Sequence, residues 1–223
     1  MRHAVGFLVR LALFALIVWM LAWAASAALP SFVNLGVIAG AVLLTFPVVR
    51  LGRTVLDRHP TPAWAAWTTT AIHCALSLTF GLPIVRALVT HGQWPGWVLP
   101  IPTGVGWVLL VITLAACAIV VANLALRGLG APFFLQLSRK LAVDWLYAWT
   151  RNPMVLAAVA FFVSLGIWFQ SALFVLWVLI EVTPALLFFV KVFEERELEL
   201  RFGASYLEYR ARTPMLIPRK PRG

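Results

Sequence analysis

The sequence predicts an all-α fold, a polytopic transmembrane helical bundle with about six spans and a C-terminal cytoplasmic amphipathic helix. The first observation is composition: of 223 residues, 62% are hydrophobic and 12% are charged. Soluble domains average about 45–50% apolar and about 25% charged residues. The second observation is that the apolar residues form runs of roughly 20, the length that crosses a bilayer. The third is that nearly all basic residues outside these runs fall on the same side of the membrane when each run is taken as one crossing.

Four apolar runs, at residues 11–29, 31–49, 63–89 and 102–126, each predict one span. The last run, residues 153–193, is too long for one crossing. We expect it to fold back near "GIWFQS" (166–171) into a hairpin of two helices. The "AASAA" stretch at 24–28 resembles a signal-peptidase site, but the run before it is longer than a typical signal core. We therefore expect the first run to remain a span.

The basic residues predict that both termini are cytoplasmic. With six spans, all of the 18 Lys and Arg residues except Arg86 fall on one side, as the positive-inside rule expects. Arg86 lies near a span end, from which its side chain can reach the interface. The net charge of +10 then favours anionic lipid over nucleic acid as the partner of this face.

The two cysteines, Cys74 and Cys117, lie inside apolar runs without metal-ligand neighbours. The sequence therefore predicts neither a disulfide framework nor a metal site.

The two ends of the predicted hairpin bring polar residues together at the cytoplasmic surface. Asn152 is a favoured N-cap and Pro153 a favoured first helical residue. The N–H groups of such a helix start can bind a carboxylate or phosphate, whereas Glu194 and Glu195 suit an ammonium, a sulfonium or ribose hydroxyls. The alternative is that Asn152 and Pro153 only cap a helix and the glutamates only mark the membrane interface.

Residues 192–214 predict one amphipathic helix after the last span. Its apolar stripe holds Glu195, with Glu194 on the flank, and Gly203 can bend the helix or admit a close neighbour. The stripe consists of Leu198, Phe202, Tyr206 and Tyr209. The expected solvated face consists of Glu197, Glu199, Glu208 and Arg210.

These motifs resemble the isoprenylcysteine carboxyl methyltransferase family and the phospholipid N-methyltransferases grouped with it. The resemblance covers about residues 126–218 and begins in "GLGAPFFLQLSRKLAVDWLYAWTRNPM" (Gly128–Met154). After the hairpin, a Glu-Glu-x-x-Leu-x-x-x-Phe-Gly-x-x-Tyr-x-x-Tyr pattern follows from Glu194 to Tyr209. Residues 1–126 are then a four-span N-terminal part, and residues 127–223 are the methyltransferase core.

The resemblance implies an S-adenosylmethionine-dependent methyltransferase whose cofactor pocket faces the cytoplasm. Asn152, Pro153 and Met154 match the cofactor-binding helix start, and Glu194 matches a cofactor-contacting glutamate. We also expect Val155 and Tyr206 to line the cofactor site. Arg151 and Glu195 are the expected catalytic residues, with Glu195 as the base if the acceptor is an ammonium.

Three positions depart from the family pattern. Ala131 replaces the Thr of a Gly-Thr-Pro turn, and Val155 replaces a common Tyr. Val190, with Lys191 beside it, stands where prenyl-cysteine methylating members use an Arg for the substrate carboxylate. The acceptor is therefore open among a prenyl-cysteine carboxylate, a lipid amine and a thiol. The sequence leaves the oligomeric state open as well.

Polar residues inside the predicted spans are candidates for contact with a lipophilic acceptor. Glu181 and His73 lie at similar depths, so we expect them to pair, either as a structural hydrogen bond or within an acceptor tunnel. Asn123 can reach the pocket or simply pack between helices. The "DRHPTP" stretch (57–62) imitates the Arg-Asn-Pro motif but has no glutamate pair after it, so we assign it no function.

Two other classes of function remain as alternatives. One is an NADPH-dependent membrane reductase of sterol-reductase-like architecture, for which this chain is short. The other is a non-catalytic membrane protein or small transporter. The clustering of the motifs at one membrane face and the lack of related halves argue against transport.

Overall fold

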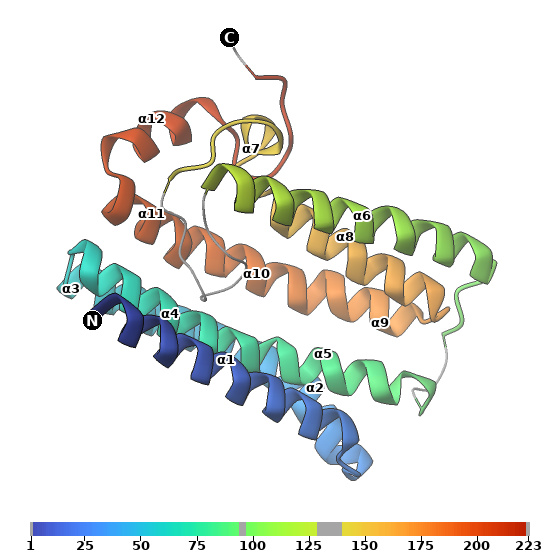
Figure 1. Cartoon of the computed structure of the whole chain (residues 1–223). Helices are drawn as coiled ribbons and strands as arrows, with labels where there is room; N and C mark the ends of the chain where they lie inside the picture. The colour runs from blue at the N-terminus through green and yellow to red at the C-terminus, as the bar shows by residue number, and fades with distance from the viewer. Residues whose placement is uncertain (1, 94–96, 129–139, 222–223) are drawn as a thin grey trace. The chain divides into compact units, whose positions relative to one another are not determined.

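A computed structural model describes residues 2–93, 97–128 and 140–221, and it confirms the all-α class (Figure 1). Within these ranges the structure has helices and no strand, apart from one isolated bridge between Val98 and Ser171.

The first half of the chain forms helices α1 (Arg2–Ser26), α2 (Ser31–Leu43), α3 (Thr45–Arg58), α4 (Pro62–Thr79) and α5 (Gly81–Thr90), then a 3₁₀ turn, η1 (His91–Gln93). The second and third predicted spans are thus each interrupted once, at Leu44 and at Phe80. Thr61 caps α4, because its hydroxyl accepts a hydrogen bond from the Trp64 N–H, and Pro62 follows as the first helical residue.

The second half begins with α6 (Thr103–Gly128), α7 (Leu146–Trp149) and α8 (Pro153–Trp168). One long helical stretch then contains α9 (Ala172–Trp177), α10 (Thr183–Phe189) and α11 (Glu195–Phe202). Two π-helical turns join these segments, η2 (Val178–Val182) and η3 (Val190–Glu194). The chain turns back between α8 and α9, where a hairpin was expected.

Among the described residues, five helical stretches are long and apolar enough to cross a membrane: Gly6–Ser26, Ser31–Arg58, Pro62–Gln93, Thr103–Arg127 and Ala172–Phe202. The fifth predicted span, α8, is apolar but has 16 residues. At 1.5 Å per residue it is shorter than the roughly 30 Å hydrocarbon layer. The six apolar segments are therefore present, and five of them have the length of a full span.

Large apolar side chains cover the outside of these helices. On α1, Trp19 is 65% exposed and Trp23 is 59% exposed; on α6, Val108 and Val111 are each 60% exposed. A water-soluble surface rarely carries apolar patches of this extent, whereas a bilayer accommodates them. The exposed surface therefore agrees with an integral membrane protein.

The chain divides into two compact units, each described separately below. The first contains α1 to α5 together with residues 180–197. The second contains residues 97–128, 140–179 and 198–221. The boundary after residue 179 falls inside the long helical stretch that begins at α9.

In the first unit, Arg86 does not extend to the membrane interface as the sequence suggested. Its side chain is 4% exposed and donates hydrogen bonds to the Asn34 side-chain oxygen at 2.7 Å and to the carbonyl oxygens of Ala24 and Ala27. The Asn34 amide in turn donates to the Leu29 carbonyl oxygen. A helix end leaves carbonyl oxygens unpaired and carries partial negative charge, so Arg86 caps the end of α1.

In the second unit, α6 and α8 run side by side in opposite directions (Figure 1). Gly106 allows this approach, because a Cβ built at this position would lie 2.5 Å from the Trp168 Cα. The segment before α6 is tied to the hairpin turn, since the Leu99 N–H donates to the Gln170 carbonyl oxygen at 2.9 Å. These contacts fix α8 against α6 at the end opposite to residue 153.

The C-terminal amphipathic helix, predicted as one helix that Gly203 can bend, is broken into two. α11 ends at Phe202 and α12 (Ala204–Arg212) begins after Gly203, whose φ of 54° suits glycine. No atom lies within 4 Å of a Cβ built on Gly203. Of its two expected roles, Gly203 therefore serves to turn the chain and not to admit a neighbour.

Candidate functional site

The start of α8 differs from the predicted cap. Asn152 stands at the N-cap position, but its side chain accepts no hydrogen bond from the helix backbone. Instead its amide group donates to the Met215 carbonyl oxygen at 2.8 Å. Asn152 thus binds the C-terminal segment and leaves the first turn of α8 uncapped.

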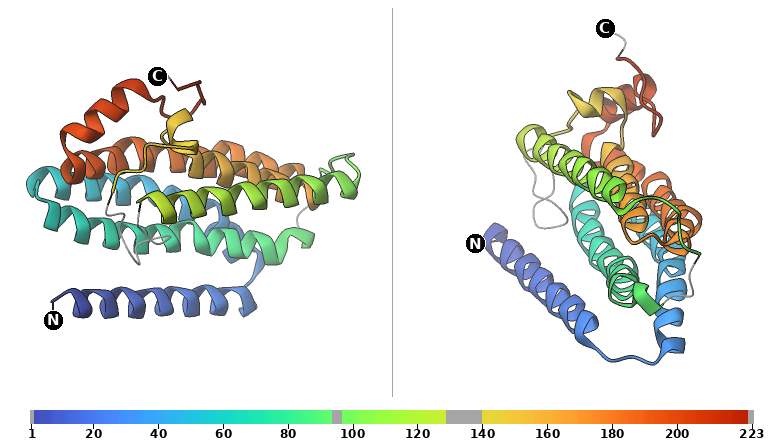
Figure 2. Two further views of the ribbon diagram at one scale, coloured as in Figure 1. Left: turned by 45° about the horizontal axis from the view of Figure 1, so that its top comes forward. Right: turned by 90° about the vertical axis from the view of Figure 1, so that its right-hand side faces the viewer.

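A set of hydrogen bonds fastens the C-terminal segment to the residues before α8. The Arg151 N–H donates to the Pro214 carbonyl oxygen at 2.9 Å, and the Arg219 N–H donates to the Trp149 carbonyl oxygen at 3.0 Å. The Thr150 hydroxyl donates to the Met215 carbonyl oxygen. Both views in Figure 2 place α7 beside α12 and the C-terminal segment. The start of α8 is therefore held in a fixed position.

The first turn of α8 offers two backbone donors. Pro153 has no N–H, and the Leu156 N–H donates to the Asn152 carbonyl oxygen. Within the ranges the structure covers, the Met154 and Val155 N–H groups have no hydrogen-bond partner. Unpaired N–H groups at the positive end of a helix are suited to a carboxylate or phosphate.

Two buried tyrosines of α12 support this region. Tyr206 is 1% exposed and packs edge-on against the Tyr209 ring. The Tyr209 hydroxyl donates to the Tyr147 carbonyl oxygen at 2.7 Å. Burial, with Tyr147 nearby, raises the pKa of the Tyr209 phenol above its usual range. Tyr209 therefore stays a neutral donor that joins α12 to α7.

The predicted glutamates lie in the first unit, at the second π-helical turn. Glu194 is the last residue of η3, and Glu195 opens α11. Glu195 is 6% exposed and lies 3.6 Å from the Lys191 ammonium. Glu197, expected on the solvated face, is also buried, at 3% exposure. π turns occur often at functional sites, so the backbone itself marks this position.

Glu181 and His73 do not pair as expected. Glu181 lies in η2, the other π-helical turn. Pro184, which has no backbone N–H, follows about one turn later. The His73 ring bonds the Thr69 carbonyl oxygen of its own helix at 2.8 Å and packs edge-on against Phe189. No hydrogen bond between the His73 and Glu181 side chains is found among the described residues, and the His73 ring bonds its own helix instead.

Asn123 on α6 is a polar residue without satisfied hydrogen bonds. Its side chain is fully buried, and in the described part of the chain neither its amide nitrogen nor its oxygen has a partner. The number of residues from Gly106 forward to Asn123 equals the number from Trp168 back to Arg151. Because α6 and α8 are antiparallel with Gly106 against Trp168, Asn123 lies level with the start of α8.

Replacing Asn123 by leucine is expected to raise the stability of the ligand-free protein. A buried polar group without partners costs about 1–3 kcal/mol, and leucine removes that cost with a side chain of the same branching. The matched control is Asn34→Leu, which removes an amide with two hydrogen-bond partners, Arg86 and Leu29, and should lower stability. Thermal unfolding in detergent measures both. A lower melting temperature for Asn123→Leu would contradict this account.

The predicted site residues fall into two groups. Arg151, Asn152, Pro153, Met154, Val155 and Tyr206 belong to the second unit, and Glu181, His73, Glu194 and Glu195 belong to the first. The Gly-x-Gly-Ala-Pro turn with Ala131 lies outside the described residues.

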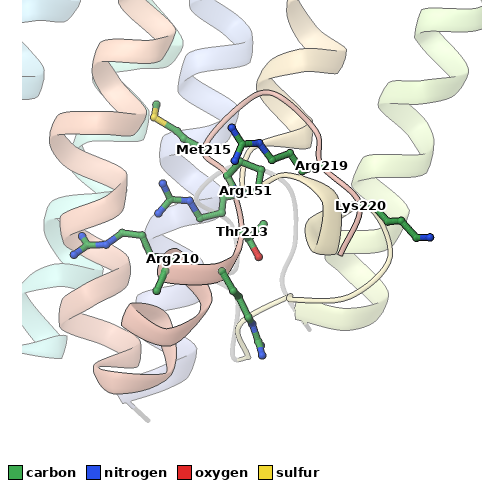
Figure 3. Close-up of a pocket in the computed structure, with 9 residues that line it drawn as sticks. Arg151, Arg210, Thr213, Met215, Arg219 and Lys220 are labelled. Carbon is green, nitrogen blue, oxygen red and sulfur yellow. The ribbon is translucent and has the colours of Figure 1, made fainter. Parts of the chain in front are cut away.

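Sequence reasoning missed a basic cavity in the second unit. It is lined by Arg151, the stretch Arg210–Met215, Arg219 and Lys220 (Figure 3). Arg151 had been expected to be catalytic and Arg210 to lie on a solvated face, and the other cations had been counted only toward membrane orientation. The density of Lys and Arg after residue 209 was the available signal.

Comparison with known proteins gives a match for part of the chain. No curated protein and no solved structure matches the chain. Residues 101–205 match the family model for phospholipid methyltransferases. The matched stretch contains α6, α8, both π turns and α11, and ends just before Tyr206. This helical stretch is therefore similar to the phospholipid methyltransferase family, in agreement with the group of membrane methyltransferases that the sequence motifs indicated.

Proposed function

We propose that this membrane protein transfers a methyl group from S-adenosylmethionine to a lipophilic or small acceptor, and that the cofactor binds at the start of α8. The observation that carries the proposal is the pair of open N–H groups at Met154 and Val155, on a helix start that Asn152 holds without capping. These donors fit the carboxylate of the cofactor's methionine part.

The chemistry asks mainly for alignment. A sulfonium is an activated methyl donor, so a protein can accelerate transfer largely by holding donor and acceptor in line. The hydrogen bonds from Arg151 and Asn152 to the C-terminal segment keep the α8 start rigid, as such alignment requires. Tyr206, buried on α12, is the proposed wall of the cofactor site.

The roles of Glu194 and Glu195 rest on the sequence motifs and on their place at a π turn. We assign Glu194 to the cofactor and Glu195, with Arg151, to the acceptor. A carboxylate or thiolate acceptor needs no base, whereas an ammonium acceptor must lose a proton, and Glu195 would then accept it. Glu181 and His73 are proposed acceptor contacts inside the membrane, and the cofactor site is proposed to face the cytoplasm.

Binding of S-adenosylmethionine to detergent-purified protein, followed by calorimetry, tests the proposal. We expect saturable binding that weakens at least tenfold in Glu194→Ala and in Asn152→Ala. The control is Glu208→Ala, which removes an exposed glutamate of α12 and should bind like the wild type. No binding to folded wild-type protein would refute the cofactor assignment, and NADPH would then be tested in the same assay.

Turnover of candidate acceptors separates the other roles. Glu195→Gln should abolish methylation of an amine acceptor and retain most activity on a carboxylate or thiol. Glu181→Gln should raise the KM for the acceptor at unchanged melting temperature. If Glu181→Gln instead lowers the melting temperature and leaves KM unchanged, Glu181 is a structural residue.

A further inference from the structure

The basic cavity of the second unit has a volume of about 430 Å³. This lies within the range of about 300–1,000 Å³ for small-molecule sites. Its walls are the end of α12, the C-terminal segment and Arg151 (Figure 3). Its lining includes five basic residues and no acidic one: Arg151, Arg210, Arg212, Arg219 and Lys220.

The positive charge of this cavity is only partly neutralised by the protein. Arg210 forms an ion pair with Glu199. Within the described ranges, the side chains of Arg212, Arg219 and Lys220 have no hydrogen-bond or ion-pair partner. Figure 3 shows Arg151 and Arg210 extending in one direction and Lys220 in the opposite one.

The backbone holds these cations near one another. The Arg219 N–H donates to the Trp149 carbonyl oxygen, and the Arg151 N–H donates to the Pro214 carbonyl oxygen. The Thr213 N–H donates to the Tyr209 carbonyl oxygen, and Thr213 is buried. Because the chain fixes the positions of several like charges, their repulsion favours binding of an anion.

The charge of the cavity distinguishes it from the proposed cofactor site. S-adenosylmethionine carries a sulfonium and an ammonium against one carboxylate, so it is a net cation. Uncompensated arginine and lysine side chains repel such a ligand. The two sites therefore need different occupants, although Arg151 and Asn152 are neighbours in the chain.

We propose that this cavity binds the phosphate group of an anionic lipid headgroup. Guanidinium groups match phosphate oxygens with paired hydrogen bonds. A membrane supplies lipid phosphates at high local concentration beside any cavity at its surface, and each nearby Lys or Arg contributes about 1 kcal/mol of attraction to an anionic leaflet. The lipid at this site is a bound stabiliser of the C-terminal segment, separate from the methyl acceptor.

The experiment compares lipids by thermal unfolding of the full chain in detergent. Phosphatidylglycerol is expected to raise the melting temperature saturably, and phosphatidylcholine is expected to do so much less. In the double variant Arg219→Gln/Lys220→Gln the half-saturating phosphatidylglycerol concentration should rise at least fivefold. The control Arg58→Gln/Lys140→Gln removes two exposed cations elsewhere and should respond like the wild type. Neither variant touches a residue placed in the cofactor site.

The source of the phosphate is tested with inorganic phosphate against chloride at matched ionic strength. A shift with lipid alone, lost in the pocket variant, supports the proposal. A shift with inorganic phosphate alone assigns the cavity to a soluble anion and overturns the lipid assignment. Equal losses in the pocket and control variants would show diffuse surface charge and overturn the site. Because no methyl donor is used, these results are independent of the S-adenosylmethionine measurement.

Discussion

Replacing Arg86 by leucine is expected to destabilise the first unit strongly. The substitution leaves the Ala24 and Ala27 carbonyl oxygens and the Asn34 side-chain oxygen without the donor that now satisfies them. Hydrogen bonds to a charged group contribute about 1.5–3 kcal/mol each, and buried acceptors without partners add a further penalty. We therefore expect a loss of roughly 3 kcal/mol or more, which corresponds to about 6–12 °C in melting temperature for a chain of this size.

Two further variants show whether the loss comes from these hydrogen bonds. Arg86→Lys keeps the charge but lacks the planar fork of donors, so it should fall between the wild type and Arg86→Leu. A double-mutant cycle with Asn34→Leu should show a coupling of at least about 0.5 kcal/mol, as residues in one network do. Melting of Arg86→Leu within about 2 °C of the wild type would mean that Arg86 is not a cap.

Replacing Gly106 by valine is expected to separate α6 from α8. The added Cβ would lie 2.5 Å from the Trp168 Cα and 2.8 Å from its backbone nitrogen. Backbone atoms cannot rotate away as a flexible side chain does, so the two helices must move apart. Overpacking costs typically about 1–3 kcal/mol, and a clash with backbone belongs at the upper end of that range.

The neighbouring glycine provides the control for this prediction. Gly104 lies on the same helix, and no atom is within 4 Å of a Cβ built there. Gly104→Val carries the same change in helix propensity without the clash, so its melting temperature should stay close to that of the wild type. Because α8 carries the proposed cofactor-binding start, Gly106→Val should also weaken S-adenosylmethionine binding. Equal stability of the two variants would contradict the close approach of α6 and α8.

The hydropathy pattern predicted the positions of the six apolar segments because burial in lipid depends on composition alone. It did not predict the interruptions at Leu44, Phe80 and Gly203, which depend on packing and backbone geometry. The amphipathic pattern also placed Glu197 in solvent, whereas it is buried. Burial of this residue depends on what packs against the helix, which the spacing of apolar residues does not specify.

The site residues show a similar division between local and distant information. That Asn152 and Pro153 begin a helix follows from their intrinsic preferences, and α8 begins at Pro153. The partner of the Asn152 amide, the Met215 carbonyl oxygen, is distant in sequence. The local sequence therefore does not show whether the Asn152 side chain caps α8 or binds the C-terminal segment. Arg86 was misassigned for the same reason, since its acceptors belong to α1 and α2. For His73, the observed partner is the Thr69 carbonyl oxygen of its own helix and not Glu181, the partner expected from similar depth.

The hydrogen bonds between residues 149–152 and 214–219 also set the order in which the protein can be made. A ribosome synthesises Asn152 long before Met215, and all the apolar helices precede Met215 in the chain. During that interval the donors of Arg151 and Asn152 lack their native acceptors, although α8 already has its full length. The membrane helices can therefore insert first, and the start of α8 becomes rigid only when translation has passed Met215. Maturation of the proposed cofactor site is thus a late event that follows insertion into the bilayer.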